Sequence, residues 1–408
     1  MDNVYVIRAG KLVTVSSLGT IYDGAMVVRD GMIEAVGDWD TLHQQFPSLR
    51  VMDYSDLVVT PSLVDCHTHL LEFAPGSLYT ITAETHFMAG KSLLLHALTS
   101  GITALGEQIC GHPKSVFSIN DYRNAVKDFP MDITFAATSI SIGFSELAHF
   151  TSITGAKSVS QSDLSNPQLI KDMASRNDYP GENLFVNATP ANFTAIDVPR
   201  AGEIIYTLDE LKEIVGIFHQ QGKEIGVHVA GEKAIDMTLD AGVDVLHHAH
   251  GITDEQIAKA KSQGSKIVAT PMGGTHLEPN SPENIVKLVE NNIDVSIATD
   301  AYLPPYPEVD WLPFKTQALQ GPDVFMLIAQ PGMKLLQRNG YDENQTLALL
   351  TANPASILGK GDQFGKLQIG MDANFLVADG IPGLEITDIE SIQRVYFRGK
   401  FVVDRIFG

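Results

Sequence analysis

The chain has 408 residues, of which 44% are hydrophobic, 19% charged and 8% aromatic, a composition typical of a globular protein. Lys and Arg number 28 against 49 Asp and Glu, which gives a net charge of −21. A surface of that sign repels phosphate backbones and anionic lipids, so we expect neither nucleic acid nor a membrane as a partner. Solubility alone accounts for the acidity.

The N-terminal sequence MDNVYVIRAGKLVTV alternates apolar and polar residues and lacks the basic flank and apolar core of a signal peptide. No run approaches the ~18 apolar residues that a membrane span requires. The two cysteines, Cys66 and Cys110, are too few for a disulfide framework in a chain of this length. We therefore expect a cytoplasmic protein in which Cys66 is a buried free thiol.

Both ends of the chain have strand-like patterns. Residues 1–59 contain short alternating segments with a hairpin signal at residues 29–31, and residues 360–408 repeat the pattern with a turn at residues 398–399. Neither end can bury a sheet face well by itself. We expect the two ends to pair into one small composite β-sandwich domain.

Residues 60–359 alternate strand-like and helix-length segments, which is typical of parallel βα units. The segment 207–222 predicts a helix, because Thr207 and Glu210 form a capping box and the segment ends in glycine. The Ser-, Asn- and Asp-rich segment 151–182 indicates a long insertion or lid. The candidate strands predict a (β/α)8 TIM barrel of α/β class, and they are residues 57–63, 102–106, 131–137, 183–188, 223–229, 243–248, 266–270 and 293–299.

The stretch VVTPSLVDCHTHL, residues 58–70, places His67 and His69 on either side of one threonine. Successive side chains of a strand point to opposite faces, so two residues that are two positions apart share a face. The two imidazoles then converge on one point, which is a candidate metal site. The alternative interpretation is a solvent-facing pair at the end of a strand.

Polar side chains occur at the ends of most of the predicted strands, where a TIM barrel carries its active site. Imidazoles and a carboxylate at one mouth are the ligands of a catalytic divalent site. One such residue is usually a cap or a core group, but a set at corresponding places of one barrel predicts a metal centre. The set comprises His67 and His69 after strand one, Glu107 after strand two, Asn187 within strand four, His228 after strand five, His248 or His250 at strand six, and Asp300 after strand eight.

These motifs resemble those of a known family. The phrases TPSLVDCHTHL, VHVAGEKAI, AGVDVLHHAHG and IATDA, followed by LLTANPASILGK and FGKLQIGMDANFLVADG, resemble the metal-dependent amidohydrolase superfamily over nearly the whole chain. The resemblance is closest to its imidazolonepropionase and Xaa-Pro dipeptidase branch. It implies an eight-stranded barrel with a composite β-sandwich, and hydrolysis at a carbonyl or amidine carbon by metal-bound hydroxide.

The resemblance also implies roles for single residues. His67 and His69 match the ligand pair of the first strand, and His228 matches the ligand of the fifth strand. Asp300 matches the aspartate of the eighth strand, which contacts the metal and takes the proton of the nucleophilic water.

The strand-six ligand has two candidates. The family places it about twenty residues beyond the fifth-strand histidine, and His248 lies 20 residues beyond His228. His250, which precedes a glycine, offers the rival alignment, so one of the two is expected to bind metal while the other bonds substrate and polarises its carbonyl. Glu232 is a further candidate for a proton shuttle, although family deaminases place that glutamate one residue earlier.

The chain departs from the family pattern at strand four. Binuclear members carry a lysine carbamate or a glutamate there, which bridges two metal ions, whereas the stretch ENLFVNATPAN offers Val186 and Asn187. Glu107 is the alternative bridge from the neighbouring strand, or else a substrate or structural contact. We therefore expect one tightly bound divalent ion, preferably Zn²⁺, with Fe²⁺, Mn²⁺ or a second ion as alternatives.

The predicted function is a zinc-dependent hydrolase of EC 3.5 type that cleaves an amide or cyclic amide of a small-molecule substrate. Deamination of a heterocycle is the main alternative, which the missing HxxE spacing after strand five disfavours. A dipeptidase, a lactonase, a phosphotriester hydrolase or a non-catalytic relative is less favoured, and a homo-oligomer is compatible with the sequence. His276 and Tyr302 lie at the mouths of strands seven and eight and are candidate substrate contacts.

Overall fold

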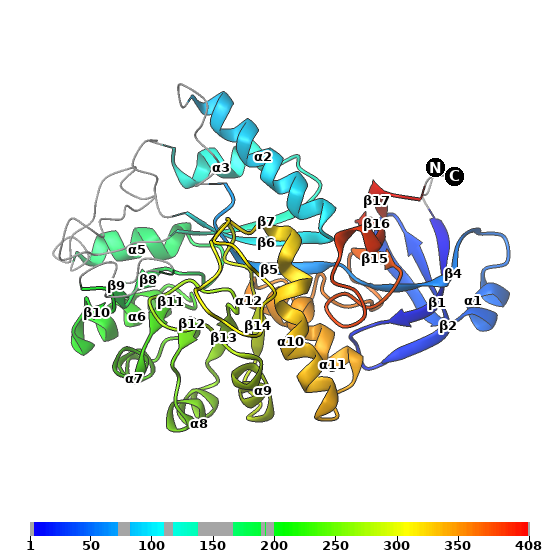
Figure 1. Ribbon diagram of the computed structural model, residues 1–408. Coiled ribbons are helices and arrows are strands. Elements are labelled where there is room, and N and C mark those ends of the chain that lie inside the picture. The colour runs from blue at the N-terminus through cyan, green and yellow to red at the C-terminus, as the bar shows by residue number, and fades with distance from the viewer. Residues whose placement is uncertain are drawn as a thin grey trace.

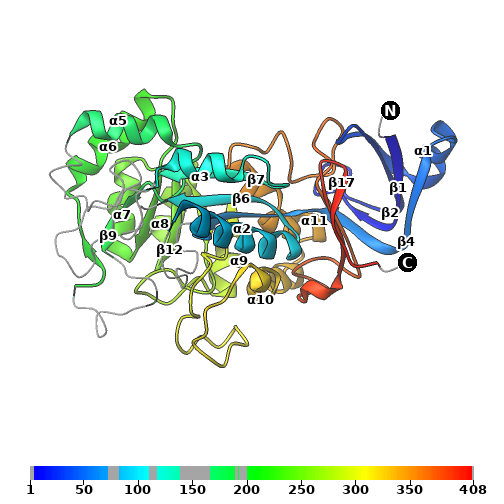
Figure 2. The same ribbon diagram turned by 90° about the horizontal axis from the view of Figure 1, so that it is seen from above.

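The computed structural model describes residues 4–71, 82–109, 117–137, 166–188, 192 and 200–406. The molecule is elongated, with a barrel and its helices at one end and a separate sheet at the other (Figures 1 and 2). Both termini lie beside that sheet (Figure 1). No helix in the described ranges is both long and apolar enough to cross a membrane.

The separate sheet has seven strands, in the order β17-β16-β15-β4-β1-β2-β3. Strands from the two ends of the chain meet where β15 runs antiparallel to β4. Asp30 and Gly31 both have positive φ, of 48° and 87°, and form the tight turn between β2 and β3 that the sequence predicts. The proposed domain boundaries at residues 59 and 360 stay a prediction. The strands are β1 (Val4–Val13), β2 (Thr20–Arg29), β3 (Met32–Asp38), β4 (Arg50–Pro61), β15 (Phe375–Ala378), β16 (Ile392–Phe397) and β17 (Lys400–Asp404).

The barrel consists of two sheets of parallel strands, in the orders β5-β6-β7 and β14-β13-β12-β11-β8. At one seam, backbone hydrogen bonds run from Asp300 N to His67 O over 3.1 Å and from His69 N to Ala301 O over 3.0 Å. At the other seam, the Asn183 amide donates to the carbonyl of Ala137 over 3.1 Å. The predicted (β/α)8 barrel with a composite β-domain is therefore confirmed. Its strands are β5 (Leu63–Thr68), β6 (Ile102–Ile109), β7 (Asp132–Ala137), β8 (Leu184–Phe185), β11 (Gly226–Ala230), β12 (Val245–His250), β13 (Lys266–Ala269) and β14 (Val295–Ile297).

Helices alternate with the barrel strands. The predicted helix at residues 207–222 is confirmed as α6, which Thr207 and Glu210 cap reciprocally. A two-stranded ribbon of β9 (Asn187–Ala188) and β10 (Glu203–Ile204) follows β8. The helices are α1 (Trp39–Gln45), α2 (Ala83–Thr99), α3 (Ile119–Val126), α5 (Pro167–Arg176), α6 (Leu208–Gln220), α7 (Glu232–Ala241), α8 (Asp254–Gln263), α9 (Pro282–Glu290), α10 (Phe325–Arg338), α11 (Glu343–Leu347) and α12 (Ala352–Ile357), with short 3-10 turns at Pro322–Val324, Ala348–Leu350 and Ile389–Ser391.

The prediction of a first barrel strand at residues 57–63 is wrong. Strand β4 of the small sheet continues to Pro61, and the first barrel strand, β5, begins at Leu63. The break falls at Pro61 and Ser62, where proline has no backbone N–H to donate and Ser62 N donates to Asn374 O over 3.2 Å. As a consequence, His67 lies inside its strand rather than beyond it.

Two further sequence predictions fall partly outside the described residues. Of the proposed insertion at residues 151–182, the part up to residue 165 lies outside the described residues, and α5 occupies residues 167–176. Cys110 also lies outside them, whereas Cys66 is a buried free thiol as expected.

The amino-terminal end of the barrel is closed by residues from the chain after β14. The ring of Phe364 is 1% exposed and packs in one apolar cluster with Val64 and Val245, which lie near the starts of β5 and β12. Helix α12 contributes to the same cluster. The candidate ligand residues lie toward the opposite end of the barrel, where the strands have their carboxyl ends.

We predict that Phe364→Ala lowers the free energy of unfolding by about 3–5 kcal/mol, because it removes a buried ring and leaves a cavity beneath the barrel. Tyr22→Ala serves as the control, since the Tyr22 side chain is 73% exposed, and should change stability by less than about 0.5 kcal/mol. Denaturant unfolding of both variants measures the difference. Equal losses of unfolding free energy in the two variants would contradict the assignment of Phe364 to the closed end of the barrel.

Candidate metal centre

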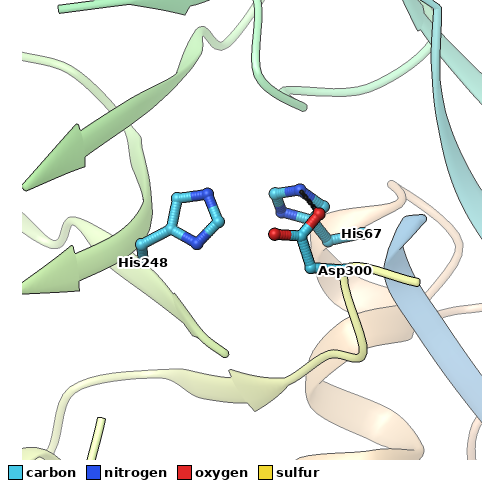
Figure 3. A group of neighbouring side chains, drawn as sticks. All are labelled: His67, His248 and Asp300. Atoms are coloured by element: carbon cyan, nitrogen blue, oxygen red, sulfur yellow. Dashed lines mark ion pairs between the residues drawn. The ribbon is translucent and has the colours of Figure 1, made fainter. Parts of the chain in front are cut away.

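Imidazole and carboxylate groups converge at one point of the barrel. Three overlapping groups bring a potential ligand atom of each member within 4.8 Å of the others. Figure 3 shows one of them, with His67 and Asp300 on one side and His248 facing them from β12. The groups are His67, His248 and Asp300; His67, His69 and Glu182; and Glu182, His228 and His248.

Glu182, which lies two residues before β8, occupies the middle of this cluster and is 1% exposed. Its Oε1 lies 2.6 Å from His228 Nδ1 and 2.8 Å from His248 Nε2. Its Oε2 lies 3.5 Å from His67 Nε2 and 3.4 Å from His69 Nε2. Each carboxylate oxygen therefore faces a different pair of imidazoles.

Asp300 follows β14 and approaches the first pair of histidines. Its Oδ1 lies 3.3 Å from His67 Nε2 and 3.5 Å from His69 Nε2. The residue has φ of 53°, a left-handed conformation that turns the chain at the end of the strand. The first pair of histidines thus faces two carboxylates.

The site strongly favours positive charge. Burial alone would raise the pKa of Glu182, but the positive charge of His67 and the hydrogen bonds from His228 and His248 outweigh it and hold that pKa well below its usual range. Burial alone would lower the pKa of His67, but Glu182 and Asp300 outweigh it and raise that pKa to about 10. The carboxylates therefore stay ionised and attract a cation to the space between them.

His228 behaves differently from His67. Burial lowers the pKa of His228 to about 4, despite the nearby Glu182. A neutral imidazole is the form that coordinates a metal ion, so this histidine is already in its ligand state at neutral pH.

The residues present fit a divalent metal ion. The Nε2 of His67 is fully buried and has no hydrogen-bond partner in the described part of the chain, yet oxygens of Asp300 and Glu182 lie 3.3 and 3.5 Å away. Imidazole nitrogens and carboxylate oxygens converging on one buried point are the donor set of zinc and similar ions.

Of the two strand-six candidates, His248 lies in the cluster and His250 lies beside it. The His248 and His250 ring centroids are 5.4 Å apart. The Nδ1 of His250 is 2.7 Å from Thr275 Oγ1, and its Nε2 is 3.1 Å from Thr270 Oγ1. His250 is thus held by hydroxyl groups rather than by carboxylates.

Glu107 lies outside all three groups. Its oxygens accept hydrogen bonds from Thr68 Oγ1 and Leu71 N, each over 2.6 Å. These contacts fit the structural alternative for Glu107 and do not support its proposed role as a metal bridge. The reason is period-two alternation, because Thr68 points away from the face that carries His67 and His69.

The remaining sequence candidates also lie apart from the cluster. The Asn187 amide exchanges hydrogen bonds of 2.9 and 3.2 Å with the backbone of Ala230, and Glu232 is exposed at the start of α7. The Tyr302 hydroxyl lies 2.8 Å from His96 Nδ1, and His276 packs against Gly202. Neither His276 nor Glu232 belongs to a group of potential ligands in the described residues.

Glu182 is the residue that the sequence analysis missed. The sequence offers Val186 and Asn187 at the carboxyl end of strand four, whereas the carboxylate of Glu182 reaches the cluster from a position two residues before β8. The signal was weak: a single glutamate in a loop, whose backbone N donates to Gln108 Oε1 over 2.9 Å. Its place before the start of β8 distinguishes it from the candidates at the carboxyl ends of the strands.

Comparison with known proteins identifies the family of the chain. The profile of the amidohydrolase family matches residues 58–402, which is most of the chain. The chain belongs to the amidohydrolase family. It is a metal-dependent amidohydrolase, as its sequence motifs implied, and the profile of the bacterial imidazolonepropionase-like composite domain matches residues 24–48.

Individual relatives of this amidohydrolase are distant. The imidazolonepropionase of Streptococcus pyogenes serotype M1 is 21% identical over 428 aligned positions, covering 94% of this chain and 91% of the relative. A solved Xaa-Pro dipeptidase with bound methionine has a TM-score of 0.70 at 15% identity, over 98% of this chain and 99% of that one. The ochratoxinase of A. niger has a TM-score of 0.72 at 16% identity, over 100% and 97%. The two structures show the shared fold.

A glycine allows the backbone to approach two residues of the cluster. Gly274 has φ of +118°, and a Cβ atom there would overlap Asp300 Oδ2 and the ring of His248. Its backbone N donates to Asn192 Oδ1 over 2.8 Å, which holds the loop in this place. The loop after β13 therefore forms one wall of the site.

We predict that Gly274→Ala lowers metal affinity at least tenfold, because the methyl group displaces Asp300 or His248. Gly264→Ala is the matched control: Gly264 has φ of +73° with open space around its Cβ position, so it adds backbone strain of about 1–2 kcal/mol without a clash. Metal content after dialysis measures the effect. Equal metal retention in both variants would contradict the conclusion that the loop at Gly274 forms a wall of the metal site.

Proposed function

We propose that this amidohydrolase cleaves a C–N bond of an amide or cyclic amide in a small molecule, with water activated at the Glu182-centred cluster. The observation that carries the proposal is the convergence of four imidazoles and two carboxylates in three overlapping groups, in which every residue but His69 is buried. The similarity to an imidazolonepropionase along 94% of the chain supports a cyclic amide.

Zinc is the proposed metal, because the donor set consists of imidazole nitrogens and carboxylate oxygens. A bound divalent ion lowers the pKa of its water from 15.7 to ~7, so that hydroxide is available at neutral pH. His67, His69 and Asp300 would hold an ion together with Glu182 Oε2.

Glu182 also bears on the number of ions. The expectation of a single ion rested on the absence of a shared carboxylate, and Glu182 removes that reason. Its Oε1 faces His228 and His248, which form a second set of donors on the other side of the carboxylate. We therefore propose room for two ions that share Glu182.

Asp300 is the proposed proton carrier. Burial alone would raise the pKa of Asp300, but the positive charge of His67 outweighs it and lowers that pKa, so the carboxylate is ionised at neutral pH. An ionised carboxylate can accept the proton of the attacking water and return it to the leaving nitrogen. Protonation of that nitrogen makes the C–N bond break.

His250 is the proposed contact to the substrate carbonyl. Burial lowers its pKa well below the usual range, so it is a neutral imidazole. Thr270 and Thr275 hold both ring nitrogens within hydrogen-bonding distance next to His248. A ring kept in place in this way can polarise a carbonyl oxygen that displaces one hydroxyl partner.

A substrate screen tests the reaction class. Metal-loaded protein is incubated with cyclic amides including imidazolones, linear acylamines, dipeptides and amino-heterocycles. Ring opening or amine release from amides supports the proposal, whereas ammonia release from amino-heterocycles identifies a deaminase. Activity confined to dipeptides would move the enzyme to the peptidases.

We predict that Glu182→Gln lowers metal affinity by 10-fold or more, because the amide removes the charge that both donor sets share. Glu107→Gln is the matched control: it alters another fully buried glutamate of the barrel, and metal content should stay at the wild-type level. Atomic emission after dialysis measures both. Metal loss in Glu107→Gln with retention in Glu182→Gln would reverse the ligand assignment.

We predict that Asp300→Asn retains most of the metal and lowers turnover about 10²–10⁴-fold, because the amide keeps the size of the side chain but cannot accept the proton. His67→Asn should instead lose metal and activity together. Metal content, melting temperature and kcat are measured on both variants with an active substrate from the screen. Wild-type turnover in metal-replete Asp300→Asn would refute the assigned role.

A further inference from the structure

A third histidine of β12, His247, contacts the cluster from behind. It is fully buried and belongs to none of the groups of potential metal ligands. Its ring meets that of His67 edge to face, with centroids 4.8 Å apart. The proposed chemistry leaves this residue without a role.

The hydrogen bonds of His247 have a defined direction. Its Nε2 lies 3.0 Å from the carbonyl oxygen of Pro180, and a carbonyl only accepts, so Nε2 carries the hydrogen. Its Nδ1 lies 2.8 Å from Nδ1 of His67. One of these two Nδ1 atoms must donate to the other.

Charge decides which one donates. Among the described residues, no carboxylate forms an ion pair with His247, and an unpaired buried imidazolium is costly. With Nε2–H present, a neutral His247 has a lone pair on Nδ1. His67 Nδ1 is therefore the donor, and its Nε2 is left to face Glu182 and Asp300.

We infer that His247 is a positioning residue that fixes the ring orientation and the Nδ1–H tautomer of His67, so that Nε2 of His67 is presented to the metal ion. Ligating histidines commonly donate their second ring N–H to a fixed acceptor, which raises their basicity. The inference rests on the proposed metal site.

The segment Pro180–Glu182 bears on His67 from both sides, directly through Glu182 and indirectly through His247. Pro180 anchors His247 behind the ring, and Glu182, two residues later, faces the ring nitrogen in front. The orientation of the ligand and the position of the shared carboxylate are therefore set by one segment.

Two substitutions separate this role from packing. His247→Phe keeps a ring but can neither accept from His67 nor donate to Pro180. His247→Gln keeps both functions, because its amide oxygen accepts and its amide nitrogen donates. His86→Leu is the control for loss of a buried histidine elsewhere, since His86 bonds Tyr122 on the outer helices.

The readout is the zinc dissociation constant, measured by competition with a chelator, together with the melting temperature of the metal-free protein. His247→Phe should weaken zinc binding about 10- to 100-fold. His247→Gln should bind at least several-fold more tightly than His247→Phe, and His86→Leu should match the wild type.

The outcomes distinguish this inference from the proposed function. If the wild type binds no stoichiometric zinc, the metal site itself fails. If the wild type binds zinc and His247→Phe binds it equally well, or His247→Gln is as weak as His247→Phe, the positioning role is overturned. Should His247→Phe fail to fold, near-wild-type zinc affinity in His247→Gln still supports the role, and a 10-fold or greater loss in His247→Gln overturns it.

Discussion

A buried carboxylate surrounded by imidazoles is the constraint on which the site depends. Removing an ionised Glu182 from water is expensive unless opposite charge and hydrogen bonds compensate. His228 and His248 contact one oxygen of this carboxylate, and His67 and His69 lie near the other. Because these histidines come from three separate strands, compensation exists only when the barrel is closed, and the attraction for a cation arises with the fold.

The backbone of β12 is shaped to serve this constraint. His248 and Ala249 have positive φ of 69° and 48°, and the register between β11 and β12 shifts by one residue at this point. In a regular strand His248 and His250 would share one face. The bulge instead gives the three histidines of this strand different surroundings: His247 contacts His67, His248 contacts Glu182 and Thr270, and His250 contacts Thr270 and Thr275.

A second buried carboxylate closes the barrel beside the site. Asp65 accepts hydrogen bonds from Thr299 Oγ1 over 2.5 Å and from His67 N over 3.3 Å, so it ties β5 to the segment after β14. Burial raises its pKa to about 7, although these hydrogen bonds oppose the shift. This link holds His67 and Asp300 side by side, although they are more than 200 residues apart in the chain.

The sequence by itself determined the barrel, the composite sheet pattern and the candidate ligands at the strand ends, because each rests on local periodicity or spacing. His67, His69, His228, His248 and Asp300 all lie at or near strand ends, where a sequence pattern can find them. Only the tertiary structure decided which sheet takes each part of the apolar run at residues 57–63, since β4 pairs with β15 as far as Pro61 and β5 begins at Leu63. It also decided that Glu182, His247 and Gly274 lie at the cluster. A lone glutamate, a histidine beside a ligand and a glycine in a loop have no local signature, because their function depends on atoms that only the closed barrel brings within hydrogen-bonding distance.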